Sequence, residues 1–225
     1  MRPATEALAR KIAAESLLDH FLLVGGTALS IYLDHRLSED LDFATSDKSL
    51  PKKAISTLLE RLTNEGCAIE DTTPVAARQD AINDGYDIEE YYQDWLVDGV
   101  KLTFFTLEEK NGRMKLVNDP GAPWDQNLRL ASLETLFVTK SLVLVDRHTL
   151  RDNFDMYTLL ASKHFSYANL VHAYKTYRPG ASLEIPKQRL LDRDYPITDP
   201  GLSGLVDEPE ADIVNRIYHY FSTII

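Results

Sequence analysis

Asp40 and Asp42 stand two positions apart, behind the glycine pair Gly25 and Gly26. The glycines follow a short apolar run, Phe21–Val24, so we expect a strand that leads into a tight turn. Backbone N–H groups in such a turn can approach a phosphate closely, and a helix that starts there favours negative charge. Carboxylates two apart on a strand share a face and repel each other unless a cation lies between them. We predict Mg²⁺ as that cation, since it binds carboxylates together with phosphate oxygens.

Each part of this pattern has an ordinary structural interpretation when taken alone. Two glycines after a strand usually form a plain turn, and an Asp-Leu-Asp run is often a solvated strand edge. The combination is more specific, because strand, glycine turn, helix and a second strand with paired acids follow one another within residues 21–43. Thr27 stands at the start of the helix, where its hydroxyl is expected to help hold the same phosphate.

The elements that must position these residues follow from apolar spacing, glycines and caps. Helical spacing predicts helices over residues 4–18, 27–33, 52–64, 132–144, 149–163, 166–177 and 210–222. Strands are expected at 21–24 and 40–44, and Asp98-Gly99 predicts a hairpin of 91–97 with 100–106. Strands therefore precede residue 130 and helices follow it. This order predicts an α+β fold, with a mixed-sheet core over 1–130 and a helical domain over 131–225.

Composition limits the class of protein. The 225 residues are 44% hydrophobic and 26% charged, as in globular proteins, and Cys67 is the only cysteine, which excludes an internal disulfide framework. The N-terminus lacks an apolar signal core and no run is long enough to cross a bilayer, so we expect a cytoplasmic protein without a membrane partner. Net charge is −11, but residues 161–193 carry six basic and two acidic side chains. That stretch is either a polyanion-binding surface or a solvated helix face.

Two blocks of sequence resemble the AbiEii/AbiGii toxin family of nucleotidyltransferase-like proteins. The first is Gly25-Gly26-Thr27-Ala28-Leu29 with His35-Arg36-x-Ser38-x-Asp40-x-Asp42 behind it. The resemblance implies that Gly25, Gly26, Thr27 and Ser38 bind a nucleoside triphosphate. It also implies that Asp40 and Asp42 hold metal for attack on the α-phosphate.

The second block lies in residues 133–160. It contains Lys140, which by resemblance touches the triphosphate, and then Asp152 and Asp155, which by resemblance belong to the catalytic residues. The residues alone leave another interpretation open. Lys140 is also typical of the surface of an amphipathic helix, and Asp152 and Asp155, three apart near a helix start, favour the helix dipole.

One position departs from the family pattern. A third carboxylate is expected two residues after a lysine on a later strand, and here Lys101 is followed by Thr103. A threonine hydroxyl is a poor metal ligand. Either a nearby acid such as Asp98 or Glu108 takes its place, or the site holds one metal ion firmly and works slowly or not at all.

The resemblance and the site together predict a Mg²⁺-dependent nucleotidyltransferase that moves a nucleoside monophosphate from a nucleoside triphosphate to a tRNA end or a protein. By resemblance it is a toxin with a separately encoded antitoxin. The alternative is a nucleotide-binding interaction protein of the same fold without transfer activity. A phosphohydrolase is a third possibility, but the histidines show no metal-ligand spacing.

Overall fold

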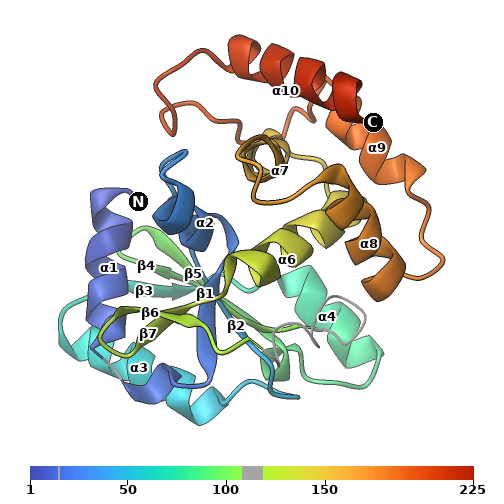
Figure 1. Ribbon diagram of the computed structural model, residues 1–225. Helices are drawn as coiled ribbons and strands as arrows, with labels where there is room; N and C mark the ends of the chain where they lie inside the picture. Colours follow the sequence, from blue (N-terminus) through green and yellow to red (C-terminus); the bar gives the residue numbers. More distant parts are fainter. Residues whose placement is uncertain (15, 108–118) are drawn as a thin grey trace.

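A single mixed sheet organises the first half of the chain (Figure 1). The computed structural model describes residues 1–14, 16–107 and 119–225. In these residues the strand order is β3-β4-β5-β2-β1-β7-β6. The strands are β1 (Phe21–Val24), β2 (Leu41–Thr45), β3 (Ile69–Asp71), β4 (Tyr92–Val97), β5 (Val100–Thr106), β6 (Ala122–Asp125) and β7 (Leu128–Leu130).

The register of the sheet lines up four residues from four strands. Val24 on β1 pairs with Asp42 on β2, which pairs with Thr103 on β5, which pairs with Asp94 on β4. Directly paired residues point to the same face of a sheet. The predicted hairpin is confirmed, with Asp98 and Gly99 at positive φ in its turn. The sheet thus carries three polar side chains in one row, on β2, β5 and β4.

Helices surround this sheet and form a second lobe, coloured yellow to red in Figure 1. The first half contains α1 (Pro3–Ala13), α2 (Gly25–Leu33), α3 (Lys52–Asn64) and α4 (Val75–Asn83), with short 3₁₀ turns η1 (Ser16–Leu18) and η2 (Ile88–Glu90). The second half contains α6 (Leu133–Asp146), α7 (Leu150–Ala161), α8 (Tyr167–Tyr177), α9 (Glu184–Leu191) and α10 (Glu210–Ile224). The predicted α+β fold, with helices after the sheet, is confirmed.

Caps explain why the later helices were predictable. The hydroxyls of Ser132, Thr149 and Ser166 each accept a backbone N–H three residues on, at the starts of α6, α7 and α8. The prediction was wrong for residues 4–18, since α1 ends at Ala13. The apolar spacing does not indicate β3, β6, β7, α4 or α9, which are only three to nine residues long.

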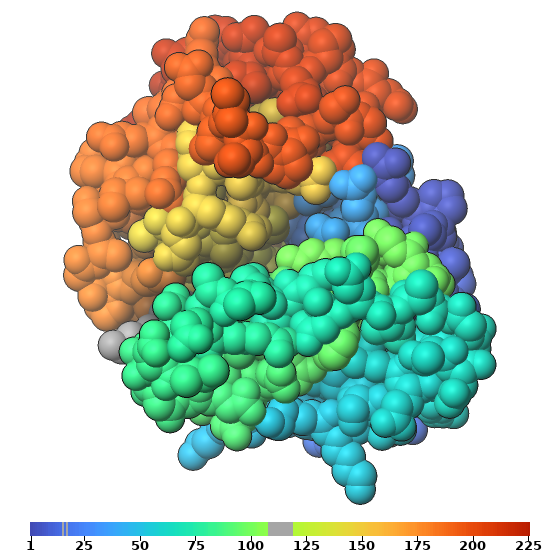
Figure 2. Space-filling view, turned by 180° about the vertical axis from the view of Figure 1, so that it is seen from behind, coloured from blue at the N-terminus to red at the C-terminus, as the bar shows by residue number. Residues whose placement is uncertain are grey.

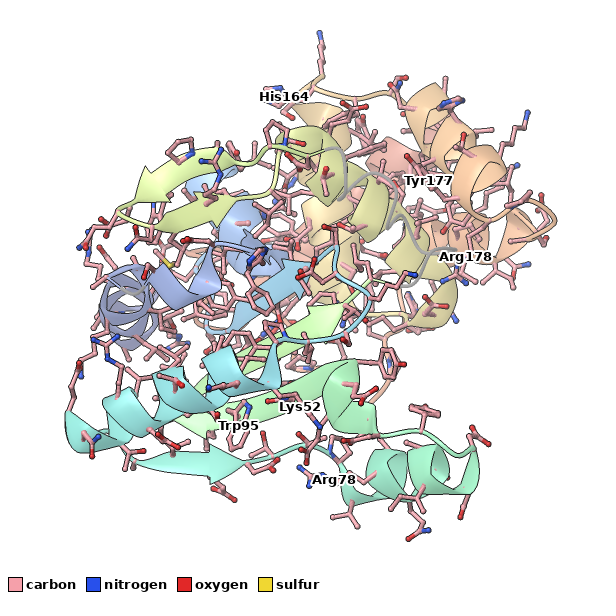
Figure 3. The ribbon with its side chains drawn as sticks, turned by 90° about the horizontal axis from the view of Figure 1, so that it is seen from below. Lys52, Arg78, Trp95, His164, Tyr177 and Arg178 are labelled. Atoms are coloured by element: carbon pink, nitrogen blue, oxygen red, sulfur yellow. The ribbon has the colours of Figure 1, made fainter. Side chains whose placement is uncertain are left out.

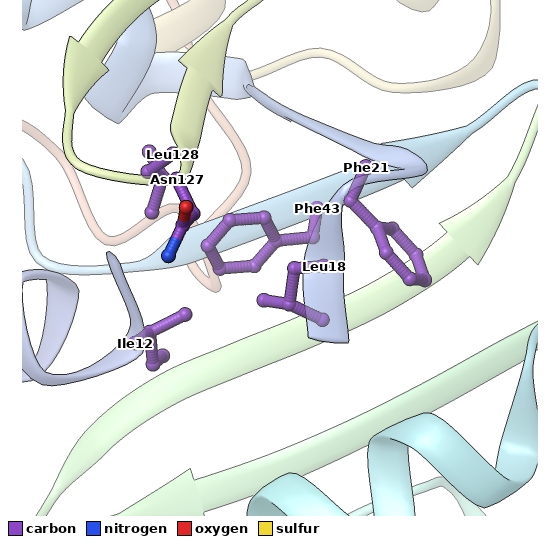
Figure 4. A pocket seen from close by; sticks show the side chains of 6 residues that line it. All are labelled: Ile12, Leu18, Phe21, Phe43, Asn127 and Leu128. Carbon is purple, nitrogen blue, oxygen red and sulfur yellow. The ribbon is translucent and has the colours of Figure 1, made fainter. Parts of the chain in front are cut away.

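One hydrophobic core connects both halves of the chain. Its buried members include Leu23 and Leu102 from the sheet and Leu136, Met156 and Ile217 from the later helices. Near its edge, the six residues drawn in Figure 4 surround a hollow that has no room for a water molecule, so this hollow is packing and not a site. The continuous core does not divide the chain at 130/131, and the domain boundary there stays a prediction. In the described ranges no helix is both long and apolar enough to span a bilayer.

Candidate active site

A pocket of about 990 Å³ lies where the sheet meets the helical lobe. Figure 2 shows this side of the molecule, with the green lobe that contains α4 and the β4–β5 hairpin facing the yellow and orange helices. The sheet and the start of α2 contribute the glycines Gly25 and Gly26 and the polar residues Asp42, Lys101, Thr103 and Thr106. The helical lobe contributes a mostly basic wall of Lys140, Arg147 and Arg178 beside Asp146. Aromatic rings from Tyr86, Tyr91, Tyr92 and Phe105 also line it.

The two glycines are needed because other residues pack directly against them. A Cβ built on Gly25 would overlap Oδ2 of Asp42, and a Cβ on Gly26 would overlap the guanidinium of Arg36. Gly25 also has φ of +69°, a region that side-chain-bearing residues rarely adopt. The glycine pair and the acidic strand, predicted to share a cleft, are therefore in direct contact through Gly25 and Asp42.

We expect Gly25→Ala to displace the Asp42 carboxylate and to weaken metal and nucleotide binding by about tenfold or more, which corresponds to about 1.4 kcal/mol. The left-handed backbone adds a stability cost of about 1–2 kcal/mol. Gly66→Ala is the matched control, since Gly66 has φ of +90° with nothing within 4 Å of its built Cβ. Isothermal titration and thermal unfolding of both variants would test this. Equal binding by the two variants would contradict it.

Asp40 and Asp42 lack partners in the part of the chain that the structure describes. No hydrogen bond or ion pair there reaches either carboxylate. Burial, and then the charge of Asp40, raise the pKa of Asp42 to about 6. Burial also raises the pKa of Asp40. Two partly buried, uncompensated carboxylates fit a bound cation, and their oxygen donors suit Mg²⁺.

Thr27 and Ser38 lie behind the pocket and do not line it. The buried Thr27 hydroxyl lies 2.7 Å from Oγ of Ser38 and donates to the backbone carbonyl of Asp40. These bonds tie the start of α2 to the residues just before β2. The contacts give both residues a positioning role, and their predicted contact with a triphosphate stays a prediction.

Lys140 lies on α6 with its ammonium group buried in an ion-pair cluster. Its Nζ is 2.7 Å from Oδ1 of Asp152 and 2.7 Å from Oδ2 of Asp155, both on α7. Burial would lower the pKa of Lys140, but the charges of the two aspartates outweigh it and raise that pKa. Lys140 lines the pocket, whereas Asp152 and Asp155 do not. Their predicted membership of the catalytic residues remains untested, and their contacts indicate that they hold Lys140 in place.

Asp155 also fixes the segment behind the glycine turn. It accepts two hydrogen bonds from Arg36, at 2.7 and 3.0 Å, and lies 2.8 Å from Nε2 of His35. Arg147 binds Asp152 at 2.7 Å while much of its side chain stays exposed at the pocket. Three cations, Arg36, Lys140 and Arg147, thus face two carboxylates. Of these cations Lys140 and Arg147 line the pocket, where their positive charge favours a bound anion.

The acid beside Thr103 is Asp94 on the neighbouring strand β4, a residue that the sequence pattern does not single out. The Thr103 hydroxyl donates to Oδ1 of Asp94 at 2.6 Å, and Asp94 is 4% exposed. The sequence offers Asp98 and Glu108 as substitutes for the third carboxylate. Asp98 instead accepts a hydrogen bond from the Ala68 N–H near the hairpin turn, and Glu108 lies outside the described residues. Asp94 comes close to the site through the pairing of β4 with β5, and no short sequence motif around Asp94 indicates this position.

We expect Thr103→Asp to lower activity, because it places a second carboxylate where a hydroxyl now donates to Asp94. The transfer rate should fall about tenfold or more, or about 1.4 kcal/mol of transition-state stabilisation. Thr103→Ser keeps the donor and should retain most of the rate. Rate measurements over a range of Mg²⁺ concentrations would decide. An increased rate in Thr103→Asp would mean that the site lacks an acid.

Most of the chain matches one known protein family. The model of a family described as "Nucleotidyl transferase AbiEii toxin, Type IV TA system" matches residues 6–212. The chain belongs to this family. Its AbiEii match includes both the glycine and aspartate block and the Lys140 block, so the resemblance drawn from the residues is confirmed.

Three proteins similar to this AbiEii member share low sequence identity with it. An uncharacterised protein of Aquifex aeolicus (strain VF5) is 25% identical over 156 residues, which are 69% of this chain and 64% of that protein. Among solved structures, the nucleotidyltransferase toxin MenT4 of Mycobacterium tuberculosis H37Rv has a TM-score of 0.55 at 12% identity, covering all of this chain and 85% of the other. JHP933 of Helicobacter pylori has a TM-score of 0.52 at 18% identity, covering 97% and 91%. At such identities these structures support the fold alone.

Proposed function

We propose that this AbiEii-family protein is a Mg²⁺-dependent nucleotidyltransferase that moves a nucleoside monophosphate from a nucleoside triphosphate to an acceptor, a tRNA end or a protein. The observation that carries the proposal is the charge arrangement of the pocket. Asp42, which has no partner in the described residues, lines one side, with Asp40 two residues before it, and Lys140, Arg147 and Arg178 line the other. A triphosphate with a divalent cation complements both.

In the proposed reaction an acceptor hydroxyl oxygen forms a bond to the α-phosphorus. The bond from that phosphorus to the bridging oxygen breaks, pyrophosphate leaves, and the hydroxyl proton passes to solvent. When bound, Mg²⁺ would lower the pKa of the attacking hydroxyl and offset charge on the leaving group. The protein contributes mostly position and charge. Gly25 and Gly26 let the backbone approach the phosphates, and Lys140 and Arg147 offset their charge.

The aromatic side of the pocket offers a place for a nucleobase. Tyr86 and Tyr91 are 45% and 40% exposed, with ring centroids 5.8 Å apart. Bases of any kind stack on such rings, so this wall supports a nucleotide ligand without indicating which one. The family is a toxin–antitoxin family, and we propose a separately encoded antitoxin as the cognate partner.

A second candidate is a nucleotide-binding interaction protein that lacks transfer activity. One observation favours it: within residues 1–14, 16–107 and 119–225, no group of three or more His, Cys, Asp or Glu side chains is arranged to hold a metal ion. Two carboxylates alone bind Mg²⁺ weakly unless phosphate oxygens complete the set.

Incubation with each α-labelled nucleoside triphosphate, Mg²⁺ and total RNA or cell protein separates these candidates. Label on RNA or on protein supports transfer and identifies the acceptor class. Nucleotide binding without label transfer supports the interaction protein. Free phosphate or free nucleoside monophosphate would support hydrolysis instead. A parallel reaction with Asp42→Asn excludes a contaminating transferase.

A further inference from the structure

Lys101 is a lysine on the acidic side of the pocket. It lies on β5 two residues before Thr103, lines the pocket, and has 45% of its side chain exposed. Its Nζ is 3.0 Å from Oδ2 of Asp94, which is almost fully buried. A buried carboxylate fixes one end of this pair, so the ammonium group is held in the pocket more firmly than a surface lysine.

Both carboxylate oxygens of Asp94 already have partners, and its side chain is almost fully buried. Its Oδ1 accepts from Thr103 at 2.6 Å, and its Oδ2 accepts from the Tyr92 hydroxyl at 2.5 Å in addition to Lys101. A ligand for Mg²⁺ needs an accessible oxygen lone pair. Asp40 and Asp42, by contrast, have no such donors in the described part of the chain. Asp94 on β4 therefore binds Lys101 rather than completing a metal site.

The charge of Lys101 reaches the two unpaired acids. Lys101 lines the pocket together with Asp42, and its positive charge acts on the carboxylates of both Asp40 and Asp42. The sheet register places Asp42, Thr103 and Asp94 on one face, and Lys101, two residues before Thr103 on β5, shares that face. An ammonium group in this position repels any further cation that approaches the same acids.

We propose that the site holds one divalent cation, on Asp40 and Asp42, and that the ammonium group of Lys101, fixed by Asp94, serves as the second positive charge beside the nucleotide. The inference rests on the proposed function, because it concerns how that site carries charge. It also accounts for Thr103: a hydroxyl that donates to Asp94 helps to aim Lys101, whereas a carboxylate there would compete for it.

The first test is the stoichiometry of metal binding. Mn²⁺ is titrated into the whole protein with a saturating non-hydrolysable nucleoside triphosphate, and bound Mn²⁺ is counted by electron paramagnetic resonance after subtracting the ion bound by free nucleotide. One Mn²⁺ per chain is expected. Two per chain would overturn the inference and leave the proposed function standing. None at all would overturn the proposed function itself.

The second test removes the lysine charge. Lys101→Met should tighten Mn²⁺ binding at least threefold, because a repelling charge is gone, and should slow transfer at least tenfold. Structural damage would weaken both, so the opposite directions identify the charge effect. Unchanged or weaker Mn²⁺ binding would overturn the inference.

Two controls accompany this variant. Lys101→Arg keeps the charge and should keep the stoichiometry and the Mn²⁺ affinity close to wild type. Lys52→Met removes a lysine of matched exposure, 46%, whose Nζ lies 2.8 Å from Oδ2 of Asp87. Lys52, labelled in Figure 3, and Asp87 do not line the pocket. It should change neither metal binding nor transfer.

Discussion

Asp42→Asn is expected to abolish nucleotide transfer while the protein becomes more stable. The isosteric amide removes a metal-binding charge, and we expect the rate to fall by at least about 1000-fold, or about 4 kcal/mol of transition-state stabilisation. The folded-state pKa of Asp42, about 6, lies above the ordinary value of 3.8, so its ionised form opposes folding at neutral pH. Removing that charge should raise the free energy of unfolding by about 1–2 kcal/mol.

Rate measurements and denaturant titrations on the same preparation would test both parts of this expectation. Asp80→Asn, on the exposed face of α4, is the control for loss of an acidic side chain and should change neither quantity. Transfer at the wild-type rate by Asp42→Asn would rule out the proposed metal site. A loss of activity together with a loss of stability would indicate that Asp42 has a structural role.

Asp155→Ala is expected to have the largest effect on stability. Asp155 is fully buried and binds His35, Arg36 and Lys140, so its removal leaves cationic groups buried without that partner. Breaking a buried ion pair in this way costs about 3–5 kcal/mol. Because domains are stable by only about 5–15 kcal/mol, this variant should show a much lower midpoint of unfolding. Glu208→Ala, which removes the carboxylate of the partly exposed pair with Arg216, should cost about 0–1 kcal/mol.

The same cluster predicts how stability depends on pH. Burial raises the pKa of Asp155, but the charges of Lys140 and Arg36 outweigh it and hold that pKa well below 3.8. The pKa of Asp152 is also lowered. A lowered folded-state pKa adds stability that is complete above about pH 4 and is lost as the pH falls further. Unfolding free energies between pH 7 and pH 2 should therefore fall more steeply for wild type than for Asp155→Asn. Equal slopes would contradict the ion-pair cluster.

Local signals in the sequence were sufficient where the structure depends on neighbours along the chain. Helix α3 was predicted with its observed ends, and the Asp98-Gly99 hairpin follows directly from residue types. The AbiEii resemblance came from two short blocks and is confirmed by the family match. Short strands such as β3 and β7 were missed because sheet pairing, rather than their own apolar pattern, holds three residues extended.

The sequence by itself determined which chemical groups are present at this site: a glycine pair, two acids two positions apart, and a lysine on a later helix. Only the tertiary structure decided which of these groups are free to bind. It pairs Lys140 with Asp152 and Asp155, turns Thr27 toward Ser38, and places Asp94 beside Thr103 and Lys101. The physical reason is that spacing fixes which face a side chain leaves. The partner that neutralises it comes from strand register and helix packing between residues far apart in the chain.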